Sequence, residues 1–495
     1  MLSREYSKFY ADGGWQEPDS SERIDVYSPA SGEVIGYVPK ASTADVDRAV
    51  EAARKAFCES DWRHRPVEER AECCERLAAL LAEHREEFRD LVIDELGCTF
   101  GLADYYQSVA PTLHWNYAAA VGRETTFEEV RESDLSPLAG GGGAGIVKFA
   151  GKSLVVKEPV GVVAVFCAYN FAYPCVGQKA APALMAGCTV IVKVPDPDPL
   201  AIFAMGDLIT EAGFPPGVIN IIAAGPAESE HLVRHPDVDM VSFTGSTTVG
   251  KLVSAACGEQ IKPCVTELGG KSAAIVLEDA DVDEALPTLV GISAATNSGQ
   301  SCVCMSRILV PRSRHDEIAG KLRDAFAALK IGGPLEPDTV IAPLVSKEQQ
   351  ERVLAHIRQA VEEGATVATG GNAPEGFDGY YVEPTLLTDV SNDMTIAQEE
   401  VFGPVIAVIP FDDEDEAVRI ANDSKYGLAG CVFTADVAHG FEIARQVRTG
   451  SFAVNTFGAD FNAPFGGFKD SGFGRDLSLH ALDKYVGLKT VWINH

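Results

Sequence analysis

The feature that most constrains the fold is a series of four short apolar runs in the middle of the chain. They are "GVVAVFCA" (161–168), "CTVIVKV" (188–194), "VINIIAAG" (218–225) and "DMVSFTG" (239–245), and longer helix-like segments separate them. Strands that are buried on both faces of a parallel sheet read as nearly continuous apolar runs, because crossover helices cover both faces. This part of the chain therefore predicts a parallel sheet with crossover helices.

A second alternation of the same kind begins after Gly269, and helical periodicity precedes the first. At 495 residues the chain is too long for one hydrophobic core, so two α/β units in tandem, the first with a helical prelude, fit the length. The prelude is expected to be helical over 44–57, over 66–97 and again up to about Ala120. In the second unit we expect strands at 273–278, 306–310, 380–387, 404–410 and 429–434, and helices at 346–363 and 414–423.

Charge and segment composition exclude several classes of function. The formal net charge is -31, whereas binding to nucleic acid needs concentrated Lys and Arg, so no nucleic-acid partner is expected. The first residues contain no apolar core of a signal peptide, and no run approaches the length of a membrane span. These observations predict a cytoplasmic protein with no membrane partner.

The stretch "NSGQSCVCM" (297–305) holds two cysteines that can form a metal site, a disulfide or a nucleophile. The 12 cysteines of the chain form no regular framework, and without a secretion signal they should be reduced. Zinc half-sites need a different spacing from that of Cys73–Cys74 or Cys302–Cys304, so no metal is expected. A nucleophile is the remaining interpretation, with Cys304 as a small packing residue.

A nucleophilic cysteine needs an oxyanion donor and a group that moves protons. Glu267, in "VTELGGKS" (265–272), and Asn170, in "CAYNFAYP" (167–174), each follow a predicted strand. Partial burial raises the pKa of a carboxyl toward the range of a general base, and a side-chain amide can donate to an oxyanion. Each residue alone is more often structural, but three such groups at strand ends favour a catalytic site.

The signal for a nucleotide is weaker, because the fingerprint G-x-G-x-x-G is absent. In "FTGSTTVG" (243–250) a strand runs into Gly245 and Ser246 and then into a helix, whose free N–H groups can bind an anion. In "VIVKVPDPDPL" (190–200), Lys193 and Asp196 follow a strand end, where a cation and a carboxylate can hold ribose hydroxyls. A stretch like the first is more often a plain connection than a phosphate site, and the second can equally be a Pro-rich surface turn.

Taken together, the motifs resemble those of the NAD(P)-dependent aldehyde dehydrogenase superfamily, in its hydrolytic, non-CoA-acylating type. The resemblance runs from about Val26 to the C-terminus and implies an aldehyde dehydrogenase-like α/β fold. This fold has a Rossmann-type NAD-binding domain (1–123 and 160–266), an α/β catalytic domain (267–480) and a small β oligomerisation element (124–159 and 481–495). The matching motifs, in the family's order, are "EPVGVVAVFCAYNF", "FTGSTTVG", "ELGGKS", "GQSC", "EEVFGPV" and "PFGGFKDSGFGR".

The resemblance implies a role for each matching residue. Cys302 is the nucleophile that forms a thiohemiacetal and then a thioester, Asn170 with the Cys302 backbone N–H holds the oxyanion, and Glu267 activates the hydrolytic water. Lys179 and Asp476 are a pair that relays protons. The residues implied for NAD binding are Lys193 and Asp196 at the adenosine ribose, Ser246 at the pyrophosphate, Glu400 and Phe402 at the nicotinamide ribose and ring, and also Gly225, Gly245 and Tyr169.

The substrate implied is a small aldehyde, bound in a tunnel that by position includes Phe171, Cys175, Gln178, Thr296, Ser301, Asp460, Phe461 and Phe465. This set has no arginine to clamp a second carboxylate, which favours uncharged aliphatic or aromatic aldehydes. Asp196 should repel a 2′-phosphate, which favours NAD over NADP. Edge strands expected at 145–159, as two strands, and at 488–494 imply a homodimer or homotetramer.

Some positions depart from the family's pattern. The usual Pro-Trp-Asn-Phe-Pro reads Ala168-Tyr-Asn-Phe-Ala172, Asp196 and Asp476 replace the commoner glutamates, and 124–144 is expected to be an extra surface excursion. Two other activities are considered. A CoA-acylating dehydrogenase commonly lacks a glutamate at the position of Glu267, and a catalytically idle structural relative need not keep Cys302, Glu267 and Asn170.

Overall fold

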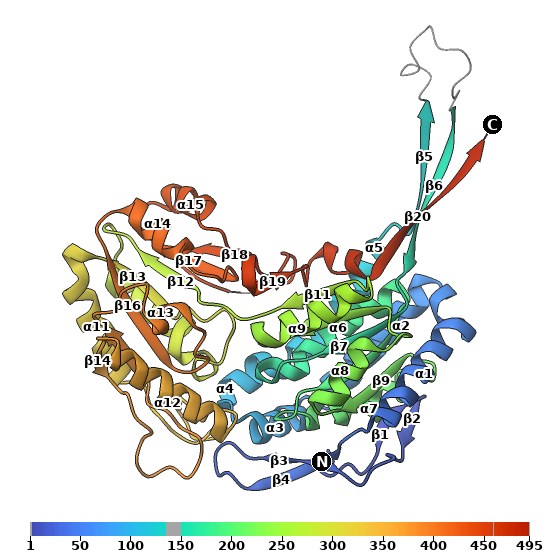
Figure 1. Ribbon diagram of the computed structural model, residues 1–495, viewed down its shortest axis with the longest axis horizontal. Helices are drawn as coiled ribbons and strands as arrows, with labels where there is room; N and C mark the ends of the chain where they lie inside the picture. The colour runs from blue at the N-terminus through green and yellow to red at the C-terminus, as the bar shows by residue number, and fades with distance from the viewer. Residues whose placement is uncertain (1, 135–149, 459, 495) are drawn as a thin grey trace.

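In the computed structural model, which describes residues 2–134, 150–458 and 460–494, two large sheets lie side by side and a smaller sheet projects from one end (Figure 1). The first large sheet has the strand order β19-β11-β10-β7-β8-β9-β1-β2. Its central strands are parallel, and the strands at both edges are antiparallel to their neighbours. The bounds are β1 (Phe9–Ala11), β2 (Gly14–Gln16), β7 (Val162–Phe166), β8 (Thr189–Val194), β9 (Ile219–Ala223), β10 (Met240–Thr244), β11 (Cys264–Glu267) and β19 (Gly472–Phe473).

The four apolar runs of the sequence form β7 to β10, so the predicted sheet is confirmed. From β7 the chain runs outward through β8 and β9, and it then returns so that β10 lies on the other side of β7. The strand order reverses at this point, and doubly wound sheets bind ligands beyond the carboxyl ends of the strands there. The residues that follow β7 and β10 are therefore placed at the natural ligand site of the sheet.

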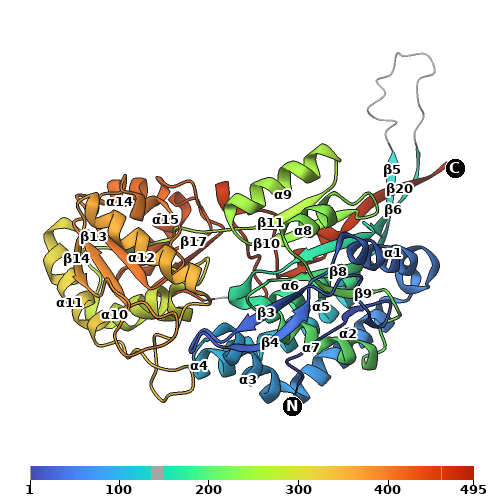
Figure 2. The ribbon, with the colours of Figure 1, turned by 60° about the horizontal axis from the view of Figure 1, so that its bottom comes forward.

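Helices cover both faces of the first sheet (Figure 2). On one face lie α1 (Thr43–Glu59), α8 (Pro226–Arg234) and α9 (Thr247–Glu259), and on the other lie α6 (Ala172–Ala186) and α7 (Leu200–Glu211). An outer layer packs on α6 and α7 and consists of α2 (Val67–Glu83), α3 (Arg85–Leu96) and α5 (Ala110–Glu124), with the short α4 (Phe100–Leu102) beside it. The single helix predicted over 66–97 is thus two helices that part at His84, and Gly97, at φ 75°, ends the second as expected.

The second large sheet has the order β14-β15-β16-β13-β12-β17-β18 and is parallel except for β14. Alternate residues of β12 face opposite helix layers, so Ile275 packs toward α12, α14 and α15, and Ala274 and Val276 pack toward α10 and α11. The predicted strands and helices of this unit are present, but β15 begins only after Pro384, which has no N–H for a ladder. The strands are β12 (Ala273–Val276), β13 (Arg307–Pro311), β14 (Thr366–Thr369), β15 (Thr385–Thr388), β16 (Val405–Phe411), β17 (Ala429–Phe433) and β18 (Ser451–Val454); the helices are α10 (Val282–Val290), α11 (His315–Ala327), α12 (Lys347–Glu362), α13 (Thr395–Gln398), α14 (Glu414–Asn422) and α15 (Val437–Gln446).

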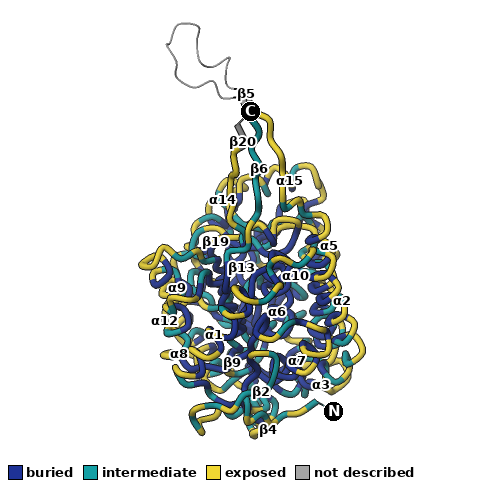
Figure 3. Tube along the Cα trace, turned by 90° about the vertical axis from the view of Figure 1, so that its right-hand side faces the viewer, coloured by how far each residue is buried: buried dark blue, intermediate teal, exposed yellow. Residues whose placement is uncertain are grey.

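The third sheet is an antiparallel arm, β20-β6-β5, that leaves the body and carries the C-terminus (Figures 1 and 3). Its strands are β5 (Glu128–Asp134), β6 (Ala150–Pro159) and β20 (Val486–Asn494). The prediction that 124–144 is a surface excursion is wrong for 128–134, which pairs with β6 along its whole length. The described part of 145–159 is one strand, not two, and residues 145–149 lie outside the described residues.

A separate two-stranded sheet lies apart from the three larger ones. The hairpin β3 (Arg23–Tyr27) and β4 (Val34–Pro39) lies at the edge of the body, far from the arm (Figure 1). Among the described residues, no helix is both long and apolar enough to cross a bilayer.

The arm generates a prediction about assembly. β20 pairs with β6 from Val486 to Asn494, and it exposes large apolar side chains, with Leu488 71% and Trp492 66% accessible. Deleting residues 488–495 removes most of this ladder and leaves the edge of β6 unpaired, and unpaired edges invite pairing with other chains. We expect the truncated protein to change its assembly, seen by light scattering as aggregate or as monomer. An unchanged particle mass would contradict this role of β20.

Candidate active site

One cavity of about 1710 Å³ lies between the two large sheets and is lined by residues of both. From the first sheet, the segments that follow β7, β8 and β10 reach it, as does the end of β11. From the second unit, the loops around 296–303, 400–402 and 457–465 reach it. The cavity therefore lies at the carboxyl ends of the parallel strands of the first sheet, where the strand order reverses.

Cys302 reaches this cavity on a loop whose backbone is unusual. Asn297, Ser298 and Gly299 have φ values of 49°, 53° and 74°, in the left-handed region that only glycine adopts without cost. Ser298 Oγ donates to the Ala342 carbonyl at 2.8 Å and accepts from the Ala342 N–H at 3.0 Å, which holds the turn. Strained backbone of this kind persists only where its surroundings determine it, and it is frequent at functional sites.

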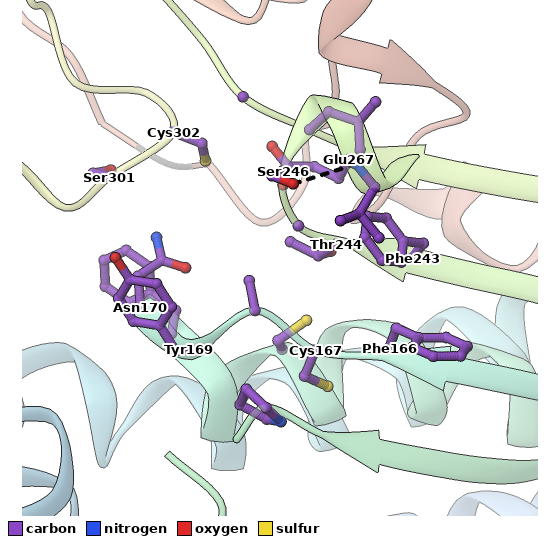
Figure 4. Close-up of a pocket in the computed structure, with 18 of the residues that line it drawn as sticks. Phe166, Cys167, Tyr169, Asn170, Phe243, Thr244, Ser246, Glu267, Ser301 and Cys302 are labelled. Carbon is purple, nitrogen blue, oxygen red and sulfur yellow. Dashed lines mark hydrogen bonds between the residues drawn. The ribbon is translucent and has the colours of Figure 1, made fainter. Parts of the chain in front are cut away.

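Asn170 lies at the start of the helical segment after β7 and is nearly buried, at 5% accessibility. Its amide donates one N–H to the Gln300 carbonyl at 3.1 Å, which leaves the second N–H for another acceptor. The backbone carbonyl of Asn170 accepts from Gln107 at 2.8 Å and from Asn297 at 3.3 Å. Asn170 is therefore tied to the same loop that carries Cys302, and Figure 4 shows Cys302 facing the space between Asn170 and Glu267.

Glu267 is the last residue of β11 and is 7% accessible, with Oε1 buried and without a hydrogen-bond partner among the described residues. Burial raises the pKa of Glu267 to about 8, although Lys179 and the nearby Cys302 oppose the rise. Burial, followed by the charges of Glu267 and Glu400, raises the pKa of the Cys302 thiol well above its ordinary value. The arrangement holds a thiol and a carboxyl close together with their protons retained near neutral pH.

Behind Glu267 lies a buried cluster of charges. Lys179 Nζ donates to one oxygen of Asp476 at 2.9 Å, and Lys484 donates to the other. Burial alone would raise the pKa of Asp476, but the two ammonium groups outweigh it and lower that pKa to about 2. Burial lowers the pKa of Lys179, but Asp476 outweighs this effect and raises it, so both groups stay charged. The structure thus brings together the pair expected from the sequence and adds Lys484.

The residues expected at the adenosine ribose and pyrophosphate line another part of the cavity. Lys193 Nζ, near the carboxyl end of β8, and Asp196 Oδ1, just after that strand, form an ion pair at 3.0 Å. Ser246 caps α9 by accepting from the Val249 N–H at 3.3 Å, so its hydroxyl proton remains available at the helix N-terminus. The groups present fit a dinucleotide, because a hydroxyl-binding ion pair and a free helix N-terminus open into one cavity.

Glu400 and Phe402 come from the second unit and meet the first at a glycine pair. The Gly270 N–H donates to Glu400 Oε1 at 2.9 Å, and a Cβ at Gly269 would lie 2.4 Å from Glu400 Oε2. Burial raises the pKa of Glu400 to about 7, against the effect of the Gly270 bond. The ring of Phe402 meets that of Tyr169 at 5.8 Å, edge on. Side chains of both units thus form a continuous wall.

Most of the residues expected in the substrate tunnel line the cavity. Four expected site residues do not: Lys179 and Asp476, which lie behind Glu267, and Phe461 and Gly225. Phe461 lies outside the lining, with its ring 5.0 Å from that of His114, and Gly225 lies between Ala224 and Pro226, which do line the cavity. The expected residues that line it are Phe171, Cys175, Gln178, Thr296, Ser301, Asp460 and Phe465, and on the cofactor side Tyr169, Gly245, Glu400 and Phe402 with those above.

The sequence reasoning missed four residues of the site. They are Tyr106 and His114, which line the cavity, Gln300, which is fully buried and holds the Cys302 loop, and Lys484. Gln300 belongs to the motif "GQSC" and lies two residues before the expected nucleophile Cys302. The other three are on helices or turns with no motif signal, so only the packing of distant segments reveals them.

A cluster away from the cavity bears on the expectation that no metal is bound. Asp47 of α1 faces His231 of α8 and His235 just after it, with Nε2 to Oδ1 distances of 2.6 and 3.5 Å, and such a group can hold an ion. The Nδ1 atom of His235 accepts from the Asp237 N–H at 3.1 Å, which leaves the proton of the neutral ring on Nε2, toward Asp47. His231 and Asp47 are also linked by a hydrogen bond, and the absence of a metal stays a prediction.

Comparisons with known proteins give one consistent relationship. Residues 15–491 match the family described as "Aldehyde dehydrogenase family". The chain is 37% identical over 492 residues to the geranial dehydrogenase of Castellaniella defragrans, covering 99% of this chain and 100% of the relative. It is also 37% identical over 492 residues to a 3-succinoylsemialdehyde-pyridine dehydrogenase of a Pseudomonas species, covering 99% and 98%. The Mycobacterium tuberculosis aldehyde dehydrogenase complexed with NAD+ superposes with a TM-score of 0.94 at 41% identity, covering 99% of each chain.

Proposed function

The chain belongs to the aldehyde dehydrogenase family, and we propose that it oxidises an uncharged aldehyde to the carboxylic acid with NAD, through a thioester on Cys302 that water hydrolyses. The observation that carries this proposal is the convergence of Cys302, Asn170 and Glu267 on one cavity. Relatives named for geranial and for a pyridine-bearing semialdehyde support aldehydes with an apolar or aromatic body.

In the first half of the reaction, the Cys302 thiol loses its proton to water, and the resulting thiolate attacks the aldehyde carbon to give a thiohemiacetal. The negative charge that develops on oxygen is held by the second amide N–H of Asn170 and by the Cys302 backbone N–H. Both donors are fixed in advance, because Gln300 and Asn297 hold Asn170 and the left-handed turn holds the Cys302 loop. Donors that need no rearrangement stabilise a transition state most effectively.

A bound nicotinamide dinucleotide supplies the hydride acceptor that turns the thiohemiacetal into a thioester. Lys193 and Asp196 would hold its adenosine ribose, Ser246 its pyrophosphate, and Glu400 its second ribose, with Phe402 beside the ring. Gly225, which is outside the cavity lining, would act only through the position of the backbone around it.

In the second half, Glu267 takes a proton from water, which attacks the thioester and releases the acid. A base whose pKa lies near the working pH is partly deprotonated, so that it can accept a proton. It also binds that proton firmly enough to remove it from water. Lys179 opposes the rise of the Glu267 pKa, and Asp476 keeps Lys179 in place and charged, while Lys484 pairs with the other oxygen of Asp476. The cluster thus sets how basic Glu267 is and offers its proton a route to solvent.

The same proposal assigns a function to each part of the chain. Residues 1–123 and 160–266 bind the dinucleotide, residues 267–480 carry the nucleophile and the base, and the segments 124–159 and 481–495 form the oligomerisation element, whose described strands β5, β6 and β20 make up the arm. One strand crosses this division, because β19 belongs to residues 267–480 but pairs with β11 in the first sheet. The exposed apolar side chains of the arm support a homodimer or homotetramer in which β20 meets another subunit.

The nucleophile assignment predicts that Cys302→Ala abolishes turnover while NAD binding is retained, because the covalent intermediate is lost and the cofactor residues are untouched. Cys304→Ala is the matched control, since Cys304 is 7% accessible and faces the Ser293 carbonyl instead of the cavity. Steady-state NADH production and NAD titration by fluorescence measure the two effects. Oxidation by Cys302→Ala at rates near those of the unaltered enzyme would overturn the assignment.

The base assignment predicts that Glu267→Gln gives a burst of NADH in stopped-flow absorbance and then stalls, because the thioester forms but water is not activated. In the unaltered enzyme, turnover should rise with pH through about 8, since only the deprotonated form of Glu267 can accept a proton. Loss of the burst together with turnover would instead assign Glu267 to the activation of Cys302. Restoration of turnover by added CoA would favour acyl transfer over hydrolysis.

The cofactor preference is predicted from Asp196. A carboxylate accepts hydrogen bonds from ribose hydroxyls and repels a 2′-phosphate, and two unit charges about 4 Å apart cost roughly 4 kcal/mol at an effective dielectric near 20. Lys193 lies 3.0 Å from Asp196 and offsets part of this repulsion, so NAD should be preferred clearly but not absolutely.

The measurement is kcat/KM for NAD and NADP in the unaltered enzyme and in Asp196→Ser. Removing the charge should improve the use of NADP, because Lys193 then faces the phosphate without its partner. Equal use of both cofactors at the start, or no gain in the variant, would show that Asp196 does not read the ribose.

A further inference from the structure

His114 is a polar residue in the wall of the substrate end of the cavity that the proposed mechanism does not use. It lies on α5, which packs against α6, and it is 4% accessible. Pro174 and Gln178, which are one turn apart on α6, line the cavity beside it. Its Cβ lies 2.9 Å from the position that a Cβ on Gly177 would take, so the imidazole is held closely against α6.

The hydrogen bonding of His114 defines what its ring can offer to a ligand. Nδ1 lies 2.9 Å from the Pro174 carbonyl, which can only accept, so Nδ1 carries the proton. Burial lowers the pKa of His114 to about 4, which keeps the ring neutral at physiological pH. Nε2 is then a lone-pair acceptor, and no donor to it occurs among the described residues of the chain.

Several apolar and aromatic side chains line the cavity together with His114, and Gln178 is a polar neighbour on α6. The apolar and aromatic ones include Leu102, Tyr106, Phe171 and Phe465, and Phe461 packs on the ring of His114. Three cations also line the cavity, but each is engaged on the cofactor side. Lys193 pairs with Asp196, Arg234 with Glu230 and Glu259, and Arg352 donates to the Glu400 carbonyl.

We propose that His114 is a specificity-determining residue, which accepts a hydrogen bond at Nε2 from a hydroxyl or N–H group at the end of the substrate remote from the aldehyde. The preferred class is therefore a neutral aldehyde with an apolar body and a terminal hydrogen-bond donor. A ligand that displaces water from Nε2 without replacing its hydrogen bond leaves a buried acceptor unpaired, which costs affinity. This inference rests on the proposed aldehyde oxidation.

The test uses two matched series of straight-chain aldehydes, from hexanal to dodecanal. One series ends in a methyl group, and in the other a hydroxyl replaces that methyl. We expect the hydroxyl-to-methyl ratio of kcat/KM to peak at one chain length, because only one length brings the hydroxyl to Nε2. His114→Phe should lower this peak by about three- to tenfold, the range that one neutral hydrogen bond gives.

His114→Gln is the conservative variant, since its amide can donate to the Pro174 carbonyl and its oxygen can accept, and it should keep part of the peak. NAD affinity, which does not involve His114, reports on the integrity of each variant. A flat ratio across chain length, or a peak that survives in His114→Phe, would refute the inference and leave aldehyde oxidation standing. If neither series is oxidised by the unaltered enzyme, the proposed function itself fails.

Discussion

The site depends on how the chain passes from one large sheet to the other between Glu267 and Ala273. Gly269 and Gly270 lie so close to the second unit that side chains have no room there. A Cβ on Gly270 would lie 2.2 Å from the Cys302 carbonyl, and one on Gly269 would meet Glu400. The passage is held from outside by Ser471, whose hydroxyl donates to the Gly269 carbonyl at 2.6 Å and whose own carbonyl accepts from the Leu268 N–H at 3.1 Å. The close approach at these two glycines therefore fixes the positions of Glu267, the Cys302 loop and Glu400 relative to one another.

This close approach also explains why so many ionisable groups are buried around the cavity. Glu267, Glu400 and Cys302 are enclosed by the same packing that joins the units, and burial is the largest cause of the raised pKa of each. A lone buried charge would cost several kcal/mol, so burial favours the protonated forms of these groups, while Asp476 stays charged only between two lysines. The protein thus places acids with raised pKa values at the cavity and its permanent charges one layer behind them.

The sequence allowed the central strands and the three residues that meet in the cavity to be predicted, because both leave local signals. Buried parallel strands are apolar runs, and Cys302, Glu267 and Asn170 stand in motifs that resemble those of a known family. The short edge strands β1, β2 and β19 were not predicted, since a strand of two or three residues has no periodicity to read. Lys484 and His114 stand in no sequence motif. Only their contacts with Asp476 and Pro174 in the folded chain identify them as residues of the site. Phe461 was expected by position in the tunnel, but its ring turns toward His114 instead.

The departure at 168–172, where the family's two prolines and its tryptophan are absent, can be understood from the contacts of Tyr169. Proline fixes the backbone locally, whereas a side chain can fix it through distant partners. Tyr169 meets the Phe402 ring edge on at 5.8 Å, and its hydroxyl lies 3.5 Å from Gln300 Oε1, which also accepts from the Val345 N–H at 3.0 Å. The segment that carries Asn170 is thereby connected to the nucleophile loop and to the Glu400–Phe402 loop at once. The geometry around Asn170, the proposed oxyanion donor, therefore depends on contacts among three segments and not on the local stiffness of two prolines.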